Sequence, residues 1–410
     1  MPEVWMVNQY AVTPDLPGGT RHYDLGVELA KRGFTVKIFA SDTNLAVRRR
    51  TKLKSGQRYM IERRDGVEFV WIRSAEYDRN DWRRVWHMVS FALGFLRVGS
   101  RVSQASRPQV VIGSSPHPFA ALSARLLAVR REARFVLEVR DLWPQALVDM
   151  GGIAETHPGI RVMRILERYL YRSADTIIAL TPGSLEYLSK HGISEDRTAL
   201  IPNGVHPGNF RSTLPRDVAR AKYAMQEFTI VYTGAHGPAN SLHTVLEAAK
   251  LLVGEPVEFV LVGDGPSKEA IIREAAETGI RNVRFLNPVA KDEIPTLLSA
   301  ADVGLITLRN AKAFEYAVSP NKLFDYMGAG LPVICCIPGE MGRLISEAKA
   351  GIACPPENPE ALAGAVKRLL EAPASERERM GSNGREFVMR NFNREVLAEK
   401  LAGVVAGNQR

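Results

Sequence analysis

Residues able to do chemistry gather most densely between Ser319 and Pro332, in the sequence SPNKLFDYMGAGLP. Ser319 can cap a helix whose first residue is Pro320. Lys322 then falls in the first turn, where its charge opposes the helix dipole unless an anion binds there. Asp325 follows three residues later, on roughly the same face of the helix. The pattern predicts that Lys322 meets a phosphate and Asp325 meets sugar hydroxyls, as a nucleotide requires. An ordinary surface pair of these two side chains is the alternative.

Three glycine-rich loops each follow a predicted strand and precede a predicted helix. They are Pro17–Thr20 (PGGT), Thr233–Pro238 (TGAHGP) and Gly263–Pro266 (GDGP). At such turns the backbone can approach an anion, and the helix start offers free N–H groups. Glycines also make ordinary turns, and the G-x-G-x-x-G fingerprint of dinucleotide binders is absent. Three loops in matching positions favour a phosphate-bearing ligand.

Polar side chains follow two further predicted strands in the first half of the chain. His117 stands in the sequence SSPHP. The sequence EVRD, at the end of the next predicted strand, holds Glu138, Arg140 and Asp141. In parallel sheets ligands bind at the carboxyl ends of the strands, which makes His117 a candidate functional residue. Charges at a buried strand end are costly unless they are paired or hold a ligand. Either Arg140 and Asp141 form an internal ion pair, or this group recognises an acceptor.

The elements that must position these residues alternate between strands and helices. Short β-rich runs are expected at Val4–Tyr10, Thr35–Ser41, Val67–Arg73, Gln109–Ser114, Arg134–Val139, Thr176–Leu180, Thr229–Thr233, Val257–Val262, Val283–Leu286, Val303–Thr307 and Pro332–Ile337. Helical patterns lie between most of them, and the series restarts after the turn-rich stretch Ile201–Phe210. The sequence therefore predicts an α/β protein with two doubly wound parallel sheets, whose carboxyl ends face one cleft.

The composition is that of an ordinary globular protein. Hydrophobic residues make up 45% and charged residues 24% of the 410 residues, which excludes a disordered chain or a fibre. No run approaches the ~18 consecutive apolar residues of a membrane-spanning helix, and we expect no secretory signal. Three cysteines, of which Cys335 and Cys336 are adjacent, favour a reducing compartment.

Positive charge is concentrated in the first half. Residues 1–205 hold 30 Lys and Arg against 21 Asp and Glu, which accounts for the whole net charge of +9. The densest part, which we call the basic segment, is residues 48–64. It could attract nucleic acid, anionic lipid or a phosphorylated substrate, or it could be a solvated loop. Residues 82–98 follow, with an apolar stripe at 82, 85, 86, 89, 93 and 96 and a second apolar face at Phe91 and Phe95. We expect the stripe to face the core, or the helix to lie on a membrane surface.

The motifs, taken in order, extend over nearly the whole chain. They are GGTRHYDLGVELAKRGFTVKIF from Gly18, PNGV from Pro202, GDGP from Gly263, NVRFLNPV from Asn282, ADVGLITL from Ala301 and KLFDYMGAGLPVI from Lys322. Together they resemble the retaining glycosyltransferases of family 4, which have the GT-B fold. The variants SSPHPF, EVRDLWP and SPNKLFDYM are most similar to bacterial enzymes that transfer amino sugars or deoxysugars to surface-polysaccharide precursors.

The resemblance implies an arrangement of three parts. Residues 1–203 would form an acceptor-binding Rossmann-like domain and residues 204–385 a domain for the nucleotide-sugar. Residues 386–410 would form a helix that packs back on the first domain.

The resemblance also implies roles for single residues. Asp325 matches the family's ribose-binding carboxylate, but Ala317 stands where a second carboxylate is usual, and residues 235–242 lack the usual cations. Lys322, helped by Arg309, is then the substitute that neutralises the diphosphate. The expected catalytic residues are His117 and Lys322. The expected donor-binding residues are Gly18, Gly19, Gly234, His236, Lys268, Arg309, Asn321, Lys322, Leu323 and Asp325, and the expected acceptor residues are Glu138, Arg140 and Asp141.

We therefore expect a retaining glycosyltransferase that moves a sugar from a nucleoside diphosphate, UDP by the resemblance, to a lipid-linked or saccharide acceptor of polysaccharide synthesis. No Asp-x-Asp pair is present, so we expect no metal and no other cofactor. The expected location is the cytoplasm, at the inner face of an anionic membrane, with no nucleic-acid partner. A GT-B epimerase that uses Glu138 or Asp141 as a base is the alternative enzyme, and a basic binding module without turnover is the alternative class.

Overall fold

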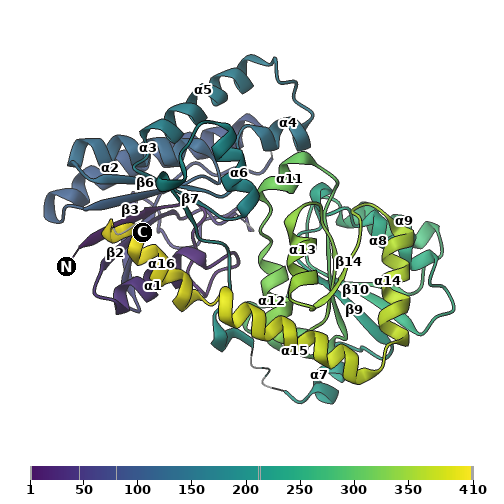
Figure 1. The fold of residues 1–410 in the computed structure, drawn as a ribbon. Coiled ribbons are helices and arrows are strands. Elements are labelled where there is room, and N and C mark those ends of the chain that lie inside the picture. The colour runs from purple at the N-terminus through teal and green to yellow at the C-terminus, as the bar shows by residue number, and fades with distance from the viewer. Residues whose placement is uncertain (1, 46, 80, 211, 213, 408–410) are drawn as a thin grey trace. The chain divides into compact units, whose positions relative to one another are not determined.

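The computed structural model describes residues 2–407 except 46, 80, 211 and 213. The chain forms two compact units, of which unit 1 comprises residues 1–202 and 394–410 and unit 2 comprises residues 203–393 (Figure 1). The expected first division, after residue 203, lies one residue from this boundary. The expected second division, after residue 385, falls inside helix α15 (Ala374–Asn391). Because that helix continues without a break to Asn391, the chain leaves unit 2 only after Asn393.

Unit 1 is built on an eight-stranded sheet in the order β3-β4-β2-β1-β5-β6-β7-β8. The strands are β1 (Glu3–Val7), β2 (Thr35–Ser41), β3 (Tyr59–Arg64), β4 (Val67–Ile72), β5 (Val110–Ser114), β6 (Arg134–Val139), β7 (Thr176–Ala179) and β8 (Thr198–Leu200). All neighbours are parallel except β3 and β4, which are antiparallel. The central strands β1 and β5 are buried along their whole length, as expected of a parallel sheet covered on both faces.

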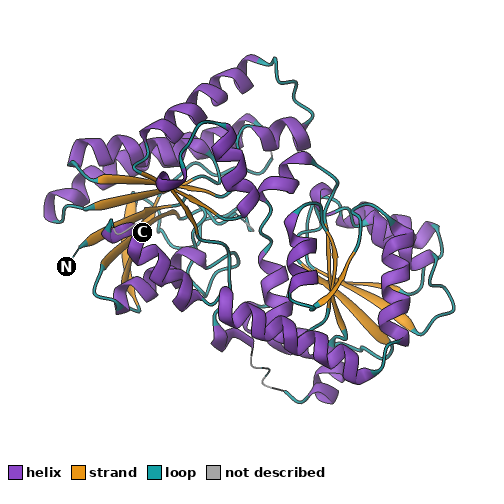
Figure 2. Cartoon of the chain, viewed as in Figure 1, coloured by secondary structure: helices purple, strands orange, loops and turns teal. Residues whose placement is uncertain are grey.

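Helices cover both faces of this sheet (Figure 2). They are α1 (Arg21–Lys31), α2 (Trp82–Ala105), α3 (Pro118–Arg131), α4 (Gln145–Gly151), α5 (Pro158–Ser173), α6 (Pro182–Lys190), the 3-10 turn η1 (Glu195–Arg197) and α16 (Arg394–Ala406). Helix α16 packs beside α1, and Leu397, Leu401 and Val404 join the core on that face. Helices α2, α3 and α5 lie on the opposite face, with α3 between the other two (Figure 1).

Unit 2 is built on a six-stranded parallel sheet in the order β11-β10-β9-β12-β13-β14. The strands are β9 (Phe228–Thr233), β10 (Val257–Val262), β11 (Val283–Leu286), β12 (Val303–Thr307), β13 (Val333–Cys336) and β14 (Gly351–Ala353). The strand order reverses between β9 and β12. In doubly wound sheets a ligand binds at the carboxyl ends of the strands at such a point.

The remaining helices belong to unit 2. They are η2 (Pro207–Phe210), α7 (Arg216–Lys222), η3 (Pro238–Asn240), α8 (His243–Lys250), α9 (Lys268–Glu277), η4 (Lys291–Glu293), α10 (Ile294–Ala300), α11 (Lys312–Ala317), α12 (Asn321–Ala329), α13 (Glu340–Glu347), α14 (Pro359–Glu371) and α15. Two buried clusters form the core, one on each face of the sheet. No helix in the described part of the chain is both long and apolar enough to cross a membrane.

Helix α2 buries the face opposite to the one that was expected to meet the core. The buried side chains include Met88, together with Phe91 and Phe95, the two residues that had been assigned to a second face. The stripe expected in the core is instead partly or largely exposed, and Trp82 and Trp86 are 69% and 52% exposed. Both faces of this helix are apolar, so the helical period alone could not decide which one meets the sheet.

Candidate functional site

Lys322 occupies the second position of α12, and its ammonium group has no anionic partner among the residues that the structure describes. The helix begins at Asn321, with Pro320 in the capping position. The Nζ atom of Lys322 lies 3.9 Å from the ring centroid of Tyr232 on β9. Within the described residues no carboxylate lies within 4 Å of Nζ, and burial of the ammonium group lowers its pKa to about 7. The cation therefore rests on an aromatic face at a helix N-terminus, a position that an anionic ligand would relieve.

The glycine loop after β9 passes directly beside Lys322. Gly234 has a φ of +140°, and a Cβ atom built there would lie 3.1 Å from Lys322 Nζ. The loop after β10 approaches the same backbone, because a Cβ on Gly263 would lie only 1.8 Å from the carbonyl oxygen of Gly234. A Cβ on Gly265 would lie 2.5 Å from the carbonyl oxygen of His236. The two loops thus pack backbone against backbone, and glycine is required for this contact.

His236 lies in the first of these two loops, and Lys268 lies beside the second. The Nζ atom of Lys268 donates to the carbonyl oxygen of Gly263 at 2.8 Å, to that of Leu286 at 3.2 Å and to Asn287 Oδ1 at 3.0 Å. His236 is fully buried, and neither of its ring nitrogens has a hydrogen-bond partner in the described structure. Burial and the nearby Lys268 lower the pKa of His236 to about 4. Lys268 therefore positions the loop, and His236 is a neutral group with unused hydrogen-bonding capacity.

The start of α12 also carries unsatisfied polar atoms. Asn203 Nδ2 donates to the carbonyl oxygen of Ser319 at 2.7 Å. Asn203 Oδ1 and Ser319 Oγ are buried without hydrogen-bond partners among the described residues. The expectation that Ser319 caps the helix was wrong, because Pro320 occupies the capping position and no side chain caps α12. The Ser319 hydroxyl thus remains available beside a cationic helix start, together with the Asn203 amide oxygen.

The other expected donor residues differ in what they can contribute. Asn321 is exposed and Asp325 half-buried, one turn beyond Lys322. The side chain of Leu323 is fully buried in the core, and its N–H donates to the carbonyl oxygen of Pro320 at 3.1 Å. Arg309 follows β12, and its Nε lies 3.8 Å from Glu357 Oε1.

In unit 1 the carboxylate expected on the acceptor side is occupied by its own neighbours. Glu138 Oε1 accepts from Arg21 Nε at 2.9 Å, and Oε2 accepts from His22 Nε2 at 2.8 Å and from Ser114 Oγ at 2.7 Å. Burial acts against the charge, but His22 and Arg21 hold the pKa of Glu138 well below its usual range. Arg21 also donates to the carbonyl oxygens of Ile201 and Pro202. Glu138 therefore fastens the start of α1 to the sheet.

The suggested ion pair between Arg140 and Asp141 is not present. Asp141 is exposed, and no carboxylate among the described residues lies within 4 Å of the Arg140 guanidinium. The backbone N–H of Arg140 lies 3.4 Å from Ser115 Oγ. Since the two charges follow β6 without pairing, the internal alternative falls away and these side chains keep their capacity for an external ligand.

His117 caps α3 and is completely buried. Its Nδ1 accepts from the N–H of Ala120 at 3.4 Å, so Nε2 carries the proton and donates to Gln9 Oε1. Gln9 Nε2 in turn donates to the carbonyl oxygen of His87 on α2 at 3.3 Å. Burial lowers the pKa of His117 to about 3, so the ring is neutral at physiological pH. Both ring nitrogens of His117 are therefore engaged inside unit 1, and the ring has no titrating proton at physiological pH.

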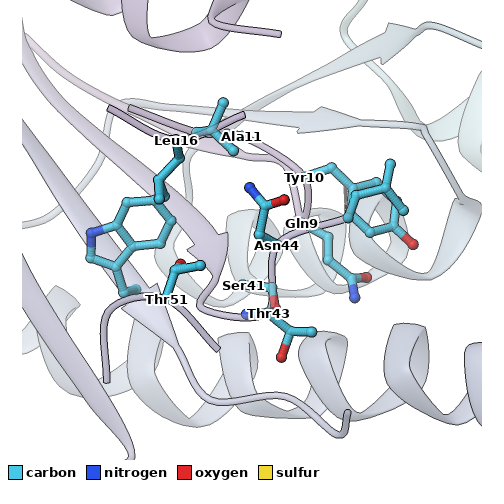
Figure 3. Close-up of a pocket in the computed structure, with 11 residues that line it drawn as sticks. Gln9, Tyr10, Ala11, Leu16, Ser41, Thr43, Asn44 and Thr51 are labelled. Carbon is cyan, nitrogen blue, oxygen red and sulfur yellow. The ribbon is translucent and has the colours of Figure 1, made fainter. Parts of the chain in front are cut away.

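The first glycine loop borders a small hollow in unit 1, drawn in Figure 3. Gly18 has a φ of +140° and packs against Val12, and Gly19 follows it directly before α1. The empty space between these side chains is about 190 Å³ when its opening to solvent is included, but it is too narrow to hold a water molecule. It is lined mainly by residues that follow β1 and β2, which are Gln9, Tyr10, Ala11, Val12, Leu16, Ser41, Thr43, Asn44 and Leu45, with Thr51 and Trp71. The Oγ1 atom of Thr43 is buried there without a partner in the described structure.

Sequence reasoning missed several of these residues. Tyr232, Asn203, Arg21 and His22 act through contacts between segments far apart in the chain, which no local pattern reveals. The polar runs after β1 and β2 could have been found, because they occupy the same strand-end position as the residues that were singled out. No three His, Cys, Asp or Glu side chains in the described ranges are grouped so as to hold a metal ion.

Two known protein families match the chain, one over most of each unit. The family described as "Glycosyl transferase 4-like domain" matches residues 18–204, and "Glycosyl transferases group 1" matches residues 216–387. The chain therefore belongs to the glycosyltransferases that join these two domains. It is a GT-B enzyme, as the resemblance had implied.

Individual relatives are distant but extend over most of the chain. A putative colanic acid biosynthesis glycosyl transferase, WcaI of Escherichia coli K12, is 26% identical over 96% of this chain and 98% of its own length. A probable glycosyltransferase, WbjE of Pseudomonas aeruginosa, is 26% identical over 74% of this chain and 76% of its own length.

Solved structures share the fold at low sequence identity. Sucrose-phosphate synthase from Thermosynechococcus elongatus has a TM-score of 0.77 at 19% identity and covers 99% of both chains. Anabaena HepE, solved with UDP and glucose, has a TM-score of 0.72 at 15% identity and covers 99% of this chain and 100% of its own.

Proposed function

We propose that this glycosyltransferase transfers a sugar from a nucleoside diphosphate, with UDP as the first candidate, to a saccharide or lipid-linked acceptor in the synthesis of a surface polysaccharide. The anomeric configuration would be retained and no metal ion would take part. The names of the curated relatives support the polysaccharide, and the UDP bound to HepE supports the nucleotide.

The observation that carries this proposal is the unpaired Lys322 at the start of α12. A diphosphate placed between the Gly234 loop and this helix start would meet an ammonium group, the helix dipole and the hydroxyl of Ser319. Asp325, one turn further along α12, would accept hydrogen bonds from the ribose hydroxyls. The whole arrangement provides positive charge where a nucleoside diphosphate departs.

The reaction balances without a further reactant. The bond between the anomeric carbon and the β-phosphate oxygen breaks, and a bond forms from the same carbon to an acceptor hydroxyl oxygen. The proton of that hydroxyl passes to the departing phosphate, which leaves from the face that the acceptor enters. Lys322 and the start of α12 stabilise the negative charge that develops on this phosphate. His117, whose Nε2–H is engaged by Gln9 Oε1, is given no step in this reaction.

We place the acceptor on unit 1, where Arg140, Asp141 and the hollow beside Gly18 offer polar groups at strand ends. The reaction would take place in the cytoplasm at the inner face of an anionic membrane, where a lipid-linked acceptor resides. The epimerase alternative required a free carboxylate base. Glu138 is fully engaged by Arg21, His22 and Ser114, which leaves Asp141 as the remaining candidate base for that alternative.

Ligand-induced thermal stabilisation tests the nucleotide site. The protein is heated with UDP, GDP, dTDP or ADP in the presence of EDTA, because a ligand that binds only the folded state raises Tm. We expect one diphosphate to raise Tm, and Lys322→Ala to abolish the shift. The matched control is Lys367→Ala on α14, a surface lysine paired with Glu255, which should keep the shift. No shift with any nucleotide, or an equal shift in Lys322→Ala, would overturn the proposed site.

A further inference from the structure

Helix α2 presents an apolar stripe to the outside of unit 1. The exposed fractions are 69% for Trp82, 50% for Val85, 52% for Trp86 and 40% for Leu93. These residues recur at the helical spacing, so they lie along one side of the helix, opposite to the buried Phe91 and Phe95. Two exposed tryptophans on one helix are unusual for a surface that faces only water.

The neighbouring helices continue this surface. On α3, Leu126 and Val129 are 39% and 53% exposed. On α5, Val162 and Ile165 are each 64% exposed and Tyr169 is 44% exposed. Helix α3 packs against both α2 and α5 on the same side of the sheet, as Figure 1 shows. We call the outer sides of α2, α3 and α5 the three-helix face.

Arginines without anionic partners accompany these apolar side chains. They are Arg97 and Arg101 on α2, Arg130 on α3, and Arg161, Arg168 and Arg172 on α5, all exposed. In the described part of the chain, none of these six lies within 4 Å of a carboxylate. Helices α2 and α3 contain no Asp or Glu, and the single one in α5, Glu167, is buried. The three-helix face is therefore both apolar and strongly positive.

The basic segment, by contrast, largely neutralises itself. Lys52 pairs with Asp15 at 2.9 Å and with Glu62 at 3.1 Å, and Arg64 pairs with Asp15 at 2.6 Å. Part of the segment is strand β3, which pairs with β4 at the sheet edge. Among the described residues, the exposed Lys and Arg of the basic segment that form no ion pair are Arg49, Lys54 and Arg58. Local charge density in the sequence therefore does not show how much of this charge is available to a ligand.

We propose that the three-helix face docks on an anionic phospholipid bilayer. Trp82, Trp86 and Tyr169 would enter the interfacial region, where amphipathic aromatic rings are favoured, and the arginines would meet lipid phosphates. A second copy of the chain is disfavoured as the occupant, since two such faces would bring like charges together. The proposal gives a surface to the membrane association proposed above, and it depends on neither the donor nor the acceptor.

Flotation of the full chain with vesicles tests the proposal, without nucleotide or acceptor. Vesicles of phosphatidylcholine are compared with vesicles that contain phosphatidylglycerol, at low and high salt. We expect binding only to the anionic vesicles and loss of binding at high salt, because the Debye length shortens. The triple variant Arg161→Gln/Arg168→Gln/Arg172→Gln should weaken binding on the order of 100-fold. The double variant Trp82→Ser/Trp86→Ser should weaken it even at low salt.

The matched control removes the same charge from the basic segment, as Arg49→Gln/Lys54→Gln/Arg58→Gln, and should bind within about threefold of the wild type. All substituted side chains are exposed, and an unchanged Tm verifies folding. Absence of wild-type binding at low salt would overturn the proposal. So would a loss of binding in the control but not in the arginine variant. A dimer in sedimentation that Trp82→Ser/Trp86→Ser dissolves, without vesicle binding, would assign the face to a second copy instead.

Discussion

The residues proposed to carry the chemistry of this enzyme are those whose charge or hydrogen-bonding capacity is not matched by a neighbouring group. Lys322 is the leading example, since burial lowers its pKa to about 7 while it has no carboxylate partner in the described structure. The side chain is mostly charged below that pH and mostly neutral above it, and the proposed diphosphate would bind the charged form. Burial of the charged ammonium group destabilises the ligand-free protein, and a bound anion would offset this unfavourable free energy.

Donor affinity should therefore depend on pH through Lys322. As pH rises from 6 to 9, we expect the KM for the donor to increase, because the ammonium group that meets the diphosphate loses its proton. Lys322→Arg should flatten this dependence, since a guanidinium stays charged throughout. The measurement is the initial rate against donor concentration at each pH, for both proteins. Identical pH profiles for the wild type and Lys322→Arg would remove Lys322 from the donor site.

Asp42 is a second residue in an unfavourable state. It follows β2, its side chain is fully buried, and neither carboxylate oxygen has a side-chain hydrogen-bond partner in the described structure. Arg50 Nε lies 3.8 Å from Oδ2 and offsets only part of the cost of burial. Burial raises its pKa to about 6. Between the unfolded and folded pKa values the folded state binds more protons, so the stability that this group confers falls as pH rises and stays low above pH 6.

Replacing this charge should stabilise the protein. We expect Asp42→Asn to raise the free energy of unfolding by about 1–3 kcal/mol at pH 7.5 and to change it little at pH 4, where the folded wild type is already protonated. Asp15→Asn is the control of opposite sign, because ion pairing with Lys52 overcomes desolvation and lowers the pKa of Asp15 to about 2. Denaturant unfolding at both pH values measures the two effects. A less stable Asp42→Asn at pH 7.5 would show that the carboxylate has a partner that compensates its burial.

At the scale of elements, the two glycine loops of unit 2 act as one unit. The Gly263 backbone approaches that of Gly234 so closely that a Cβ would lie 1.8 Å from a carbonyl oxygen. We expect Gly263→Ala to separate the loops and to cost at least 3 kcal/mol of stability or all nucleotide binding. Gly279→Ala is the matched control, because Gly279 also has a positive φ, +68°, but open space around its Cβ position.

The control should cost only about 1–2 kcal/mol, the price of a left-handed conformation without a clash. Thermal unfolding and the UDP-induced shift of Tm are measured for both variants. Equal effects of the two substitutions would mean that backbone conformation, and not the close approach of the loops, determines the need for glycine at residue 263.

The elements also show what the sequence can reveal by itself. Strands rich in apolar residues, such as Thr35–Ser41, Arg134–Val139 and Val257–Val262, lie where the pattern predicts them. The edge strand β3 reads YMIERR and was taken for part of a basic loop, because alternating charge hides its pairing with β4. Strands β8 and β14 have three residues each and are too short to leave a periodic signal.

The candidate site was predictable only in part for a related reason. The position of Lys322 in a first helical turn follows from local sequence, and the helix does begin at Asn321. Its contacts with Tyr232 and Gly234 depend on the order of strands in the sheet, which brings residues about 90 apart in the chain together. Glu138 shows the opposite error, since the sequence could not reveal that Arg21 and His22 already occupy it.

At the scale of the whole molecule, the charge is divided between the two halves of the chain. Residues 1–205 hold the entire excess of +9, and residues 206–410 hold 24 basic and 24 acidic residues. The second half therefore has no net charge to attract an anionic donor. If it binds the proposed donor, it must do so through local features, which are Lys322, the start of α12 and the closely packed glycine loops.

Because so few groups supply positive charge to the proposed donor site, the role of a metal ion can be tested on the complete enzyme. If Lys322 and the start of α12 supply the positive charge that stabilises the leaving diphosphate, a divalent cation has no remaining task. Transfer measured with full-length protein, donor and acceptor in excess EDTA should proceed within about twofold of the rate in magnesium. Lys322→Ala should then be slower by about 10²-fold or more and should regain part of its rate when magnesium or manganese is added, because the cation replaces the lost charge. A wild-type rate that collapses in EDTA and returns with manganese would contradict a metal-independent mechanism and assign the leaving-group charge to a bound cation.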